Sequence, residues 1–253
     1  MTDAVVVGWS KDVCSVTLNR PSVGNALSAD LVGGLDKVLD DCIARRPRLM
    51  VVRGEGKHFC TGFDLAHLED ESDDSLLARF CRIELLLQKV RRASFPTFAL
   101  AHGRTVGAGA DLFAACTHRL AAPGTQFAFP GAAGFGLVLG TRRLVERVGS
   151  ARATRWVTTG ASIALDEALA AGLATGMVSD GSPEEAMPGF FESAAGGAIE
   201  NPLLASALGA DDRSHDHLDL SLLVRSAAVP GLKARIAAYV KRSRQVHSST
   251  QPS

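Results

Sequence analysis

The chain has 253 residues, of which 46% are hydrophobic and 21% charged, so it can bury a sizeable core and is not expected to be disordered. Lysine plus arginine and aspartate plus glutamate are equal at 27 each, so the overall charge gives no reason to expect nucleic acid or an acidic membrane as a partner. The five cysteines are scattered and include no C-x-x-C pair, which argues against a disulfide framework and against a metal site.

The first third of the chain predicts strands followed by a helix. The short β-branched segments 4–9 and 13–19 are typical of two strands joined by a turn. Ser28 is a suitable N-cap for an amphipathic helix that continues to about Arg45, and the apolar segment 49–53 is typical of a buried strand.

The alternation of strands and helices continues along the rest of the chain. The expected strands cover 95–101 and 119–122, and the expected helices cover 76–90, an alanine-rich segment after Gly109, 141–159, 165–171 and 231–244. This order favours an α/β fold with parallel crossover connections. Residues 179–197, rich in Gly, Pro, Ala and Glu, are interpreted as a loosely specified connector.

No segment has the features of a secretion signal or of a membrane span. The first residues lack the basic and then apolar stretch of a signal peptide. No apolar run approaches the roughly 20 residues that a membrane helix needs. We therefore expect a cytoplasmic protein with no membrane partner.

Several familiar catalytic motifs are missing from the sequence. It contains no G-x-x-x-x-G-K-[ST] phosphate loop, no H-E-x-x-H zinc helix and no G-x-S-x-G nucleophile turn. Gly54 and Gly56 follow a predicted strand, but the third glycine of a dinucleotide-binding fingerprint would fall at Phe59. Nucleotide and zinc chemistry are therefore not indicated.

Two glycine-containing turns, at 56–65 and 101–112, each follow a predicted strand. Small residues let a ligand approach backbone N–H groups closely, and a helix that starts near Ala108 would aim free N–H groups at that ligand. Two such donors that face each other could hold a developing oxyanion. The alternative is that both segments are ordinary tight βα turns, since glycine is the usual turn residue.

The two turns resemble the signature segments of the enoyl-CoA hydratase/isomerase (crotonase) family, usually written F-x-A-G-x-D-L and N-G-x-x-x-G-G-G. Other segments resemble the family in the same order, and the resemblance covers roughly residues 5–180. These segments are Leu18-Asn19-Arg20-Pro21, Asn25-Ala26-Leu27-Ser28, Ala114 to Arg119, Phe127 to Pro130, and Thr158 to Val178. Each motif is moderately specific, and their common order makes the resemblance strong.

The resemblance implies roles for three residues at the thioester. In the family the thioester carbonyl sits between two backbone N–H groups, which correspond here to Phe63 and Ala108. Fixed donors bind an enolate-like oxygen better than a neutral carbonyl, so they favour chemistry at the neighbouring carbons. The first of two family glutamates corresponds to Asp111, which is the candidate catalytic residue; the alternative is an aspartate favoured in the first turn of a helix by the dipole.

The second family glutamate has no counterpart in the sequence. It would follow Pro130, where Gly131 stands, and no acidic residue is near. Adding water to a double bond needs one group to orient the water and one to supply a proton. The chain therefore departs from the hydratase pattern, and also from the isomerases, which commonly keep the acid that is missing here.

The remaining candidate residues are expected to bind the substrate. Coenzyme A carries phosphates, so cations should lie near its entrance, and three cations flank the matching segments: Arg20, Lys57 and Arg104. The segments themselves supply the other candidates, which are Gly62, Asp64, Leu65, Gly107 and Gly131. Asp64 is interpreted as a turn or cap residue rather than a base.

The resemblance also implies a fold, an assembly and an activity. The fold would be an α/β spiral of repeated ββα turns at 1–195, with a helical trimerisation segment at 196–253, and the protein a homotrimer or hexamer. The default reaction would be hydration of a 2-enoyl-CoA in fatty acid metabolism, with coenzyme A as part of the substrate and no separate cofactor. Enoyl-CoA isomerisation, another acyl-CoA reaction, or acyl-CoA binding with poor turnover are the alternatives.

Overall fold

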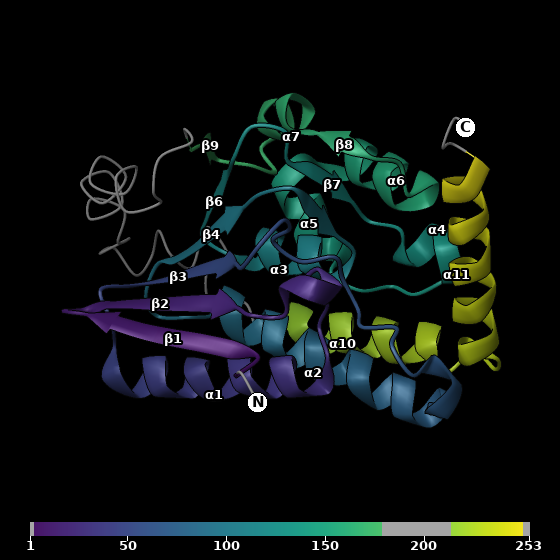
Figure 1. The fold of residues 1–253 in the computed structure, drawn as a ribbon, viewed down its shortest axis with the longest axis horizontal. Coiled ribbons are helices and arrows are strands. Elements are labelled where there is room, and N and C mark those ends of the chain that lie inside the picture. The colour runs from purple at the N-terminus through teal and green to yellow at the C-terminus, as the bar shows by residue number, and fades with distance from the viewer. Residues whose placement is uncertain (1–2, 179–213, 250–253) are drawn as a thin grey trace.

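The computed structural model describes residues 3–178 and 214–249 and contains two β-sheets surrounded by helices (Figure 1). The strands are β1 Val5–Ser10, β2 Val13–Leu18, β3 Leu49–Gly54, β4 Thr97–Ala101, β5 Arg104–Val106, β6 His118–Ala121, β7 Gln126–Ala128, β8 Ile163–Ala164 and β9 Gly176–Met177. The α-helices are α1 Ala29–Arg45, α2 Asp73–Arg91, α3 Ala108–Ala115, α4 Gly131–Phe135, α5 Thr141–Val148, α6 Ser150–Thr159, α7 Leu165–Ala171, α10 Ser214–Ala227 and α11 Leu232–Ser249.

The larger sheet has six strands in the order β1-β2-β3-β4-β6-β9. Only β1 runs antiparallel to its neighbour, and from β2 onward every neighbouring pair is parallel. The register places Val16 beside Val52 and Val52 beside Ala99. These residues are buried, as expected for central strands of a parallel sheet that is covered by helices.

The smaller sheet has the order β5-β7-β8 and shows how the chain spirals. Strand β4 enters the large sheet, β5 enters the small sheet, and α3 follows; β6 and β7 repeat the pattern before α4, α5 and α6. These two turns of the chain thus each add one strand to each sheet. The predicted α/β fold with a ββα spiral is confirmed.

The ends of the two long helices follow from their capping residues. Ser28 accepts the N–H of Leu31 at 3.2 Å and starts α1, as the sequence predicts. Helix α2 begins at Asp73, three residues before the predicted start at Leu76, because Ser72 and Ser75 form a reciprocal capping box.

The single helix predicted over residues 141–159 is wrong. The structure has α5 and α6 there, separated by Gly149, which adopts φ 79° and ψ 159°. That conformation lies far outside the helical region, and it is open to glycine because it lacks a β-carbon. The chain therefore changes direction at Gly149, and α5 can turn its first residues toward α3.

The C-terminal helix α11 is held to the core by a carboxylate at the start of α2. Asp73 accepts the N–H groups of Gly231, Leu232 and Lys233 at 2.8, 3.1 and 2.8 Å. In Figure 1, α11 stands across the end of the molecule beside α4. The predicted boundary at residues 195 and 196 lies outside the described residues, and none of the described helices is both long and apolar enough to cross a membrane.

Candidate active site

The two glycine-containing turns are joined to one another by backbone hydrogen bonds. Phe59 N–H donates to the carbonyl of His102 at 2.9 Å, Cys60 N–H to that of Arg104 at 3.4 Å, and Val106 N–H to that of Cys60 at 3.0 Å. These bonds form a short parallel bridge between Cys60 and Thr105. The backbone that follows the bridge in both turns is therefore fixed in mutual register.

Glycines allow the close approach that this bridge requires. A β-carbon on Gly109 would lie 2.4 Å from the carbonyl oxygen of Cys60, and one on Gly62 would lie 2.8 Å from that of Val106. Both neighbours are backbone atoms, which cannot move aside as a flexible side chain can. Gly62 also has φ +102°, in the left-handed half of the map that disfavours other residues.

The N–H groups of Phe63 and Ala108 lie a few residues after this bridge, and the N–H of Gly107 before Ala108 already donates to the carbonyl of Ala128 at 2.8 Å. Leu27 pairs with the residues on either side of Phe63: it donates to Gly62 at 2.8 Å and accepts from Asp64 at 3.3 Å. Because successive N–H groups of an extended segment point to opposite sides, that of Phe63 points away from Leu27. Ala108 is the first residue of α3, so its N–H has no acceptor within the helix.

An apolar cavity of about 160 Å³ lies beside these two residues. Most of the predicted site residues line it, namely Gly62, Phe63, Leu65, Arg104, Gly107, Ala108, Asp111 and Gly131. The rest of the wall is largely apolar, formed by side chains such as Phe80, Phe129, Phe135 and Leu137. Such a lining with a few polar groups is typical of small-molecule sites.

Asp111 is the one carboxylate among the described residues that line the cavity, and it is 5% exposed. Its side chain packs against Gly140, the residue before α5: a β-carbon on Gly140 would lie 2.1 Å from its Oδ1. Burial raises the pKa of Asp111 well above the usual aspartate range, while Arg143 opposes this rise and Glu84 adds to it. The carboxyl group therefore holds its proton to a higher pH than an exposed aspartate does.

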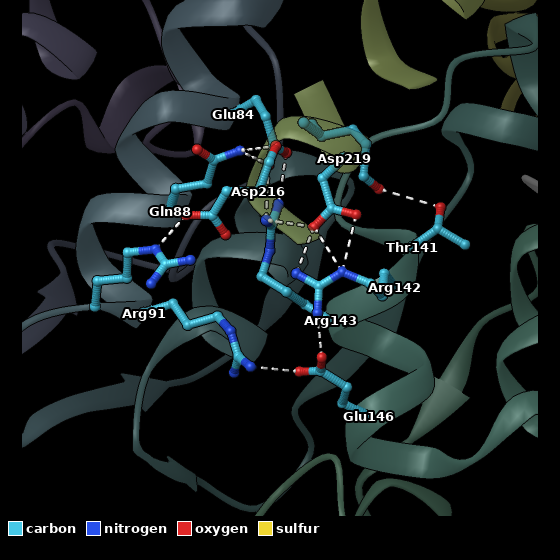
Figure 2. Close-up of polar contacts among 11 residues, drawn as sticks. Glu84, Gln88, Arg91, Thr141, Arg142, Arg143, Glu146, Asp216 and Asp219 are labelled. Atoms are coloured by element: carbon cyan, nitrogen blue, oxygen red, sulfur yellow. Dashed lines mark hydrogen bonds and ion pairs between the residues drawn. The ribbon is translucent and has the colours of Figure 1, made fainter. Parts of the chain in front are cut away.

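Glu84, a second buried acid, does not line the cavity among the described residues. Its carboxylate binds Nη1 and Nη2 of Arg143 at 2.7 and 2.6 Å, and it also accepts Nε2 of Gln88 at 2.8 Å (Figure 2). Glu84 is therefore held in an ion pair behind Asp111 and does not replace the missing second acid.

The position of that second acid is also defined by the structure. Gly131 follows Pro130, begins the short helix α4 and contributes backbone alone to the cavity wall. Tyr239, the sole tyrosine of the chain, reaches the same cavity from α11, with its ring centroid 5.5 Å from that of Phe135. Sequence reasoning missed Tyr239, since it lies well beyond the matching segments, which end at Val178, and no local pattern marks it.

Three predicted substrate-binding residues lie outside the cavity wall. Arg20 binds the carboxylate of Asp64 at 2.6 Å and the carbonyl of Ala26 at 2.7 Å. Asp64 in turn accepts the N–H of Ala66 at 3.0 Å, so it caps the first turn as the sequence suggests. Lys57 is exposed on the outer surface of the same turn.

The cations near the turns create a positive potential. Arg104 lies at the cavity wall, and its N–H donates to Nδ1 of His58 at 3.1 Å. Burial lowers the pKa of His58, and the charges of Arg104 and Lys57 lower it further. Both cations are thus close enough to influence a charged group at this edge.

Asn25 holds the backbone of the first turn in place. It belongs to the matching segment Asn25-Ala26-Leu27-Ser28, to which the sequence assigned no role. It is fully buried with φ 55°, and its side-chain oxygen accepts the N–H of Arg20 at 2.8 Å. Its amide donates to the carbonyls of Glu55 and His58 at 2.9 and 2.7 Å. The conformation and these bonds hold the backbone that leads into Cys60.

Joined turns, an apolar cavity and one buried carboxyl define a small-molecule site in an α/β spiral protein. A profile of the family described as enoyl-CoA hydratase/isomerase matches residues 13–201. A Bacillus subtilis protein named "Probable enoyl-CoA hydratase" is 32% identical over 191 residues, covering 73% of this chain and 71% of that protein. The chain belongs to the enoyl-CoA hydratase/isomerase family.

Solved structures agree with this assignment. A crystal structure from Bordetella parapertussis, described as a "putative enoyl-CoA hydratase/isomerase", matches with a TM-score of 0.85 and 37% identity over 98% of this chain and 99% of that one. An enoyl-CoA hydratase from Bacillus halodurans has the same fold, with a TM-score of 0.78 at 19% identity over 93% of this chain and 99% of that one.

We predict that Asp111→Asn changes the stability of the protein in a pH-dependent way. An aspartate in the unfolded chain titrates near ~4, whereas burial raises the folded-state pKa of Asp111. The folded state therefore holds this proton more tightly, and the parent loses stability as pH rises from the unfolded value through the raised one. The asparagine variant lacks this loss, so its melting temperature relative to the parent should rise between pH 5 and pH 8.

Thr141→Val is the matched control for this measurement. It removes another polar side chain from the cavity wall but no titrating group, so its effect on the melting temperature should be the same at both pH values. A melting-temperature difference for Asp111→Asn that stays constant or shrinks with rising pH contradicts the burial argument.

Proposed function

We propose that this chain binds an acyl-coenzyme A with the thioester oxygen between the N–H groups of Phe63 and Ala108, and that its default reaction is hydration of a 2-enoyl-CoA. The observation that carries the proposal is the convergence of the two joined turns on a cavity with one buried carboxyl. Backbone donors held in place before the reaction lose little energy to reorganisation, which is why they stabilise a developing oxyanion well.

Asp111 would act as the acid–base group of this reaction. Water attacks C3 and forms a C–O bond, electrons move to the thioester oxygen, and the protonated carboxyl of Asp111 delivers its proton to C2. The carboxylate then takes the proton that the attacking water releases, so the group returns to its starting state. The raised pKa of Asp111 supports this order of steps, since the carboxyl starts with its proton.

Coenzyme A would enter along the positive edge of the site. Arg104 at the cavity wall and Lys57 beside it are the proposed contacts for the phosphates, because both impose a positive potential there. Arg20 is a weaker candidate than its position in the sequence suggested, since its guanidinium already binds Asp64.

Isomerisation of a 3-enoyl-CoA is a second candidate, favoured by the presence of one carboxyl in the described cavity wall. A single group can take a proton from C2 and return it to C4 as the double bond moves. This reaction starts from the carboxylate, so its rate should rise with pH through the pKa of Asp111. Hydration starts from the protonated form, so its rate should fall over the same range.

The test of the proposed function is Asp111→Asn in a turnover assay. We expect hydration of crotonyl-CoA, followed by the loss of enoyl thioester absorbance, to be slow in the parent and to fall by about 10²–10⁴-fold in the variant. Calorimetric titration with a saturated acyl-CoA should show nearly unchanged binding, since asparagine keeps the shape of the side chain.

Asp166→Asn is the matched control, because it makes the same chemical change at an exposed carboxylate outside the cavity wall. Equal turnover in Asp111→Asn and the parent would show that Asp111 is not the acid–base group. If the parent binds acyl-CoA but neither hydrates nor isomerises an enoyl-CoA, the chain is a binding subunit and the proposed reaction is wrong.

We also predict the effect of Ala108→Pro, which removes one proposed oxyanion donor. Proline is favoured at the first position of a helix, and no intrahelical bond is lost there, so the variant should fold. Its turnover should fall by about 10²–10³-fold. Ala108→Gly keeps the N–H and serves as the control; equal activity in the proline and glycine variants would exclude this donor.

We also propose that the chain assembles as a trimer or a pair of trimers. Leu218, Leu222 and Val229 on and after α10 are 50%, 38% and 51% exposed, and such apolar surface is typical of an interface. Light scattering at micromolar concentration should give three or six times the mass of the chain. A monomer mass would rule out the assembly.

A further inference from the structure

A buried ion pair joins α2 to α5, the helix whose N-cap Gly140 contacts Asp111. Glu84 from α2 and Arg143 from α5 each have side chains that are 1% exposed, and they meet through two parallel hydrogen bonds of 2.7 and 2.6 Å. Figure 2 shows Arg143 between Glu84 and Asp219 of α10, whose carboxylate lies 3.6 Å from Nη1. Removing both charges from water is costly, so stability alone does not account for such a pair.

The pair belongs to the wall on which Asp111 rests. Gly140, in contact with Oδ1 of Asp111, is the N-cap of α5, and Arg143 lies in the first turn of that helix. Nε of Arg143 is buried and has no hydrogen-bond partner in the described part of the chain. Its charge is therefore compensated mainly through the two nitrogens that Glu84 binds.

Charged and titratable groups approach Asp111 from several elements. Helix α2 contributes Glu84, α5 contributes Arg143, and α10 places Asp219 on the far side of Arg143. Arg104 of β5 and Tyr239 of α11 line the same cavity. Of these groups, Arg143 and Glu84 are the ones whose charges act on Asp111, and they act in opposite directions.

We propose that Glu84 is a positioning residue: by holding the guanidinium of Arg143, it prevents that cation from drawing the proton off Asp111. The inference rests on the proposed acid–base role of Asp111. An unmasked cation near a buried carboxyl stabilises the ionised form, which is the form that cannot deliver a proton to C2. Glu84 thereby offsets the effect of Arg143, and the buried carboxyl of Asp111 stays in the form that starts hydration.

The directions of the pKa shifts agree with this assignment. Burial raises the pKa of Asp111, Arg143 lowers it and Glu84 raises it. Burial lowers the pKa of Arg143, but the hydrogen bonds and charge of Glu84, together with the charges of Asp111 and Asp219, outweigh that effect and keep the guanidinium protonated. Arg143 therefore stays charged, and its effect on the protonation of Asp111 depends on its pairing with Glu84.

The experiment follows the protonation of Asp111 directly, without substrate. The infrared band of its protonated carboxyl is identified as the one that Asp111→Asn removes, and its loss with rising pH gives a midpoint. Glu84→Gln should move this midpoint to lower pH, and Arg143→Met should move it to higher pH. In turnover, each unit of downward shift should lower hydration on the alkaline side about tenfold.

Opposite shifts distinguish this role from a merely structural one. If the pair only supported the packing, either substitution would admit water to Asp111 and both midpoints would move to lower pH. Glu146→Gln is the matched control, since Glu146 binds Arg91 and Arg142 in the same network (Figure 2) but does not act on Asp111. Glu146→Gln should leave the midpoint unchanged. The inference is overturned if the midpoint does not move in Glu84→Gln and Arg143→Met, or if it moves in the same direction in both.

A double variant covers the case in which a single buried charge prevents folding. Glu84→Gln with Arg143→Met buries no charge, and such replacements are often tolerated. Its midpoint should lie at or above that of the parent, and a fall overturns the inference. Because the infrared titration needs no turnover, an active Asp111→Asn variant would refute the proposed function while leaving the coupling of the three side chains established.

Discussion

The short parallel bridge between Cys60 and Thr105 holds together the two halves of the candidate site. The turns are separated by 35 residues in sequence, and each by itself would be an ordinary glycine turn after a strand. The bridge fixes their relative position with backbone hydrogen bonds, and the absence of a β-carbon at Gly62 and Gly109 lets the backbones meet. Substitutions at Phe63 or Ala108 other than proline keep these donors, because the N–H groups belong to the main chain.

The second feature on which the site depends is the low polarity around Asp111. Burial raises the pKa of this carboxyl, and the two opposite charges behind it act against each other. A single acidic group in an apolar cavity can both give and take a proton, provided that it starts the reaction in its protonated state. Burial favours the protonated state, and Glu84 offsets the opposing charge of Arg143 from outside the cavity wall.

The C-terminal helix α11 completes the cavity on the side where the second acid is missing. Tyr239 packs on Phe135 and comes within van der Waals range of Gly134, where a β-carbon would lie 2.7 Å from its ring. Arg242 and Arg235 donate to the carbonyls of Gly134 and Phe135 at 2.9 and 2.8 Å. The ring of Tyr239 thus covers helix α4, and the two arginines bind its carbonyl groups. The glycine and alanine residues of α4 are small enough to allow this close contact.

The sequence by itself determined the α/β class, the start of α1 at Ser28 and the two glycine turns, because periodicity, capping and turn chemistry are local properties. It also placed Asp111 one helical turn after Ala108. The break at Gly149 was missed, since a glycine within a helical pattern can also continue the helix.

Only the tertiary structure decided which candidates face one cavity and which bind each other. Arg20 and Asp64 lie in separate matching segments but form a mutual ion pair, and Glu84 is held by Arg143, which is 59 residues away in sequence. Tyr239 reaches the cavity because Asp73 caps the helix that carries it. Such contacts depend on how separate elements pack, and a spacing pattern within one segment does not contain that information.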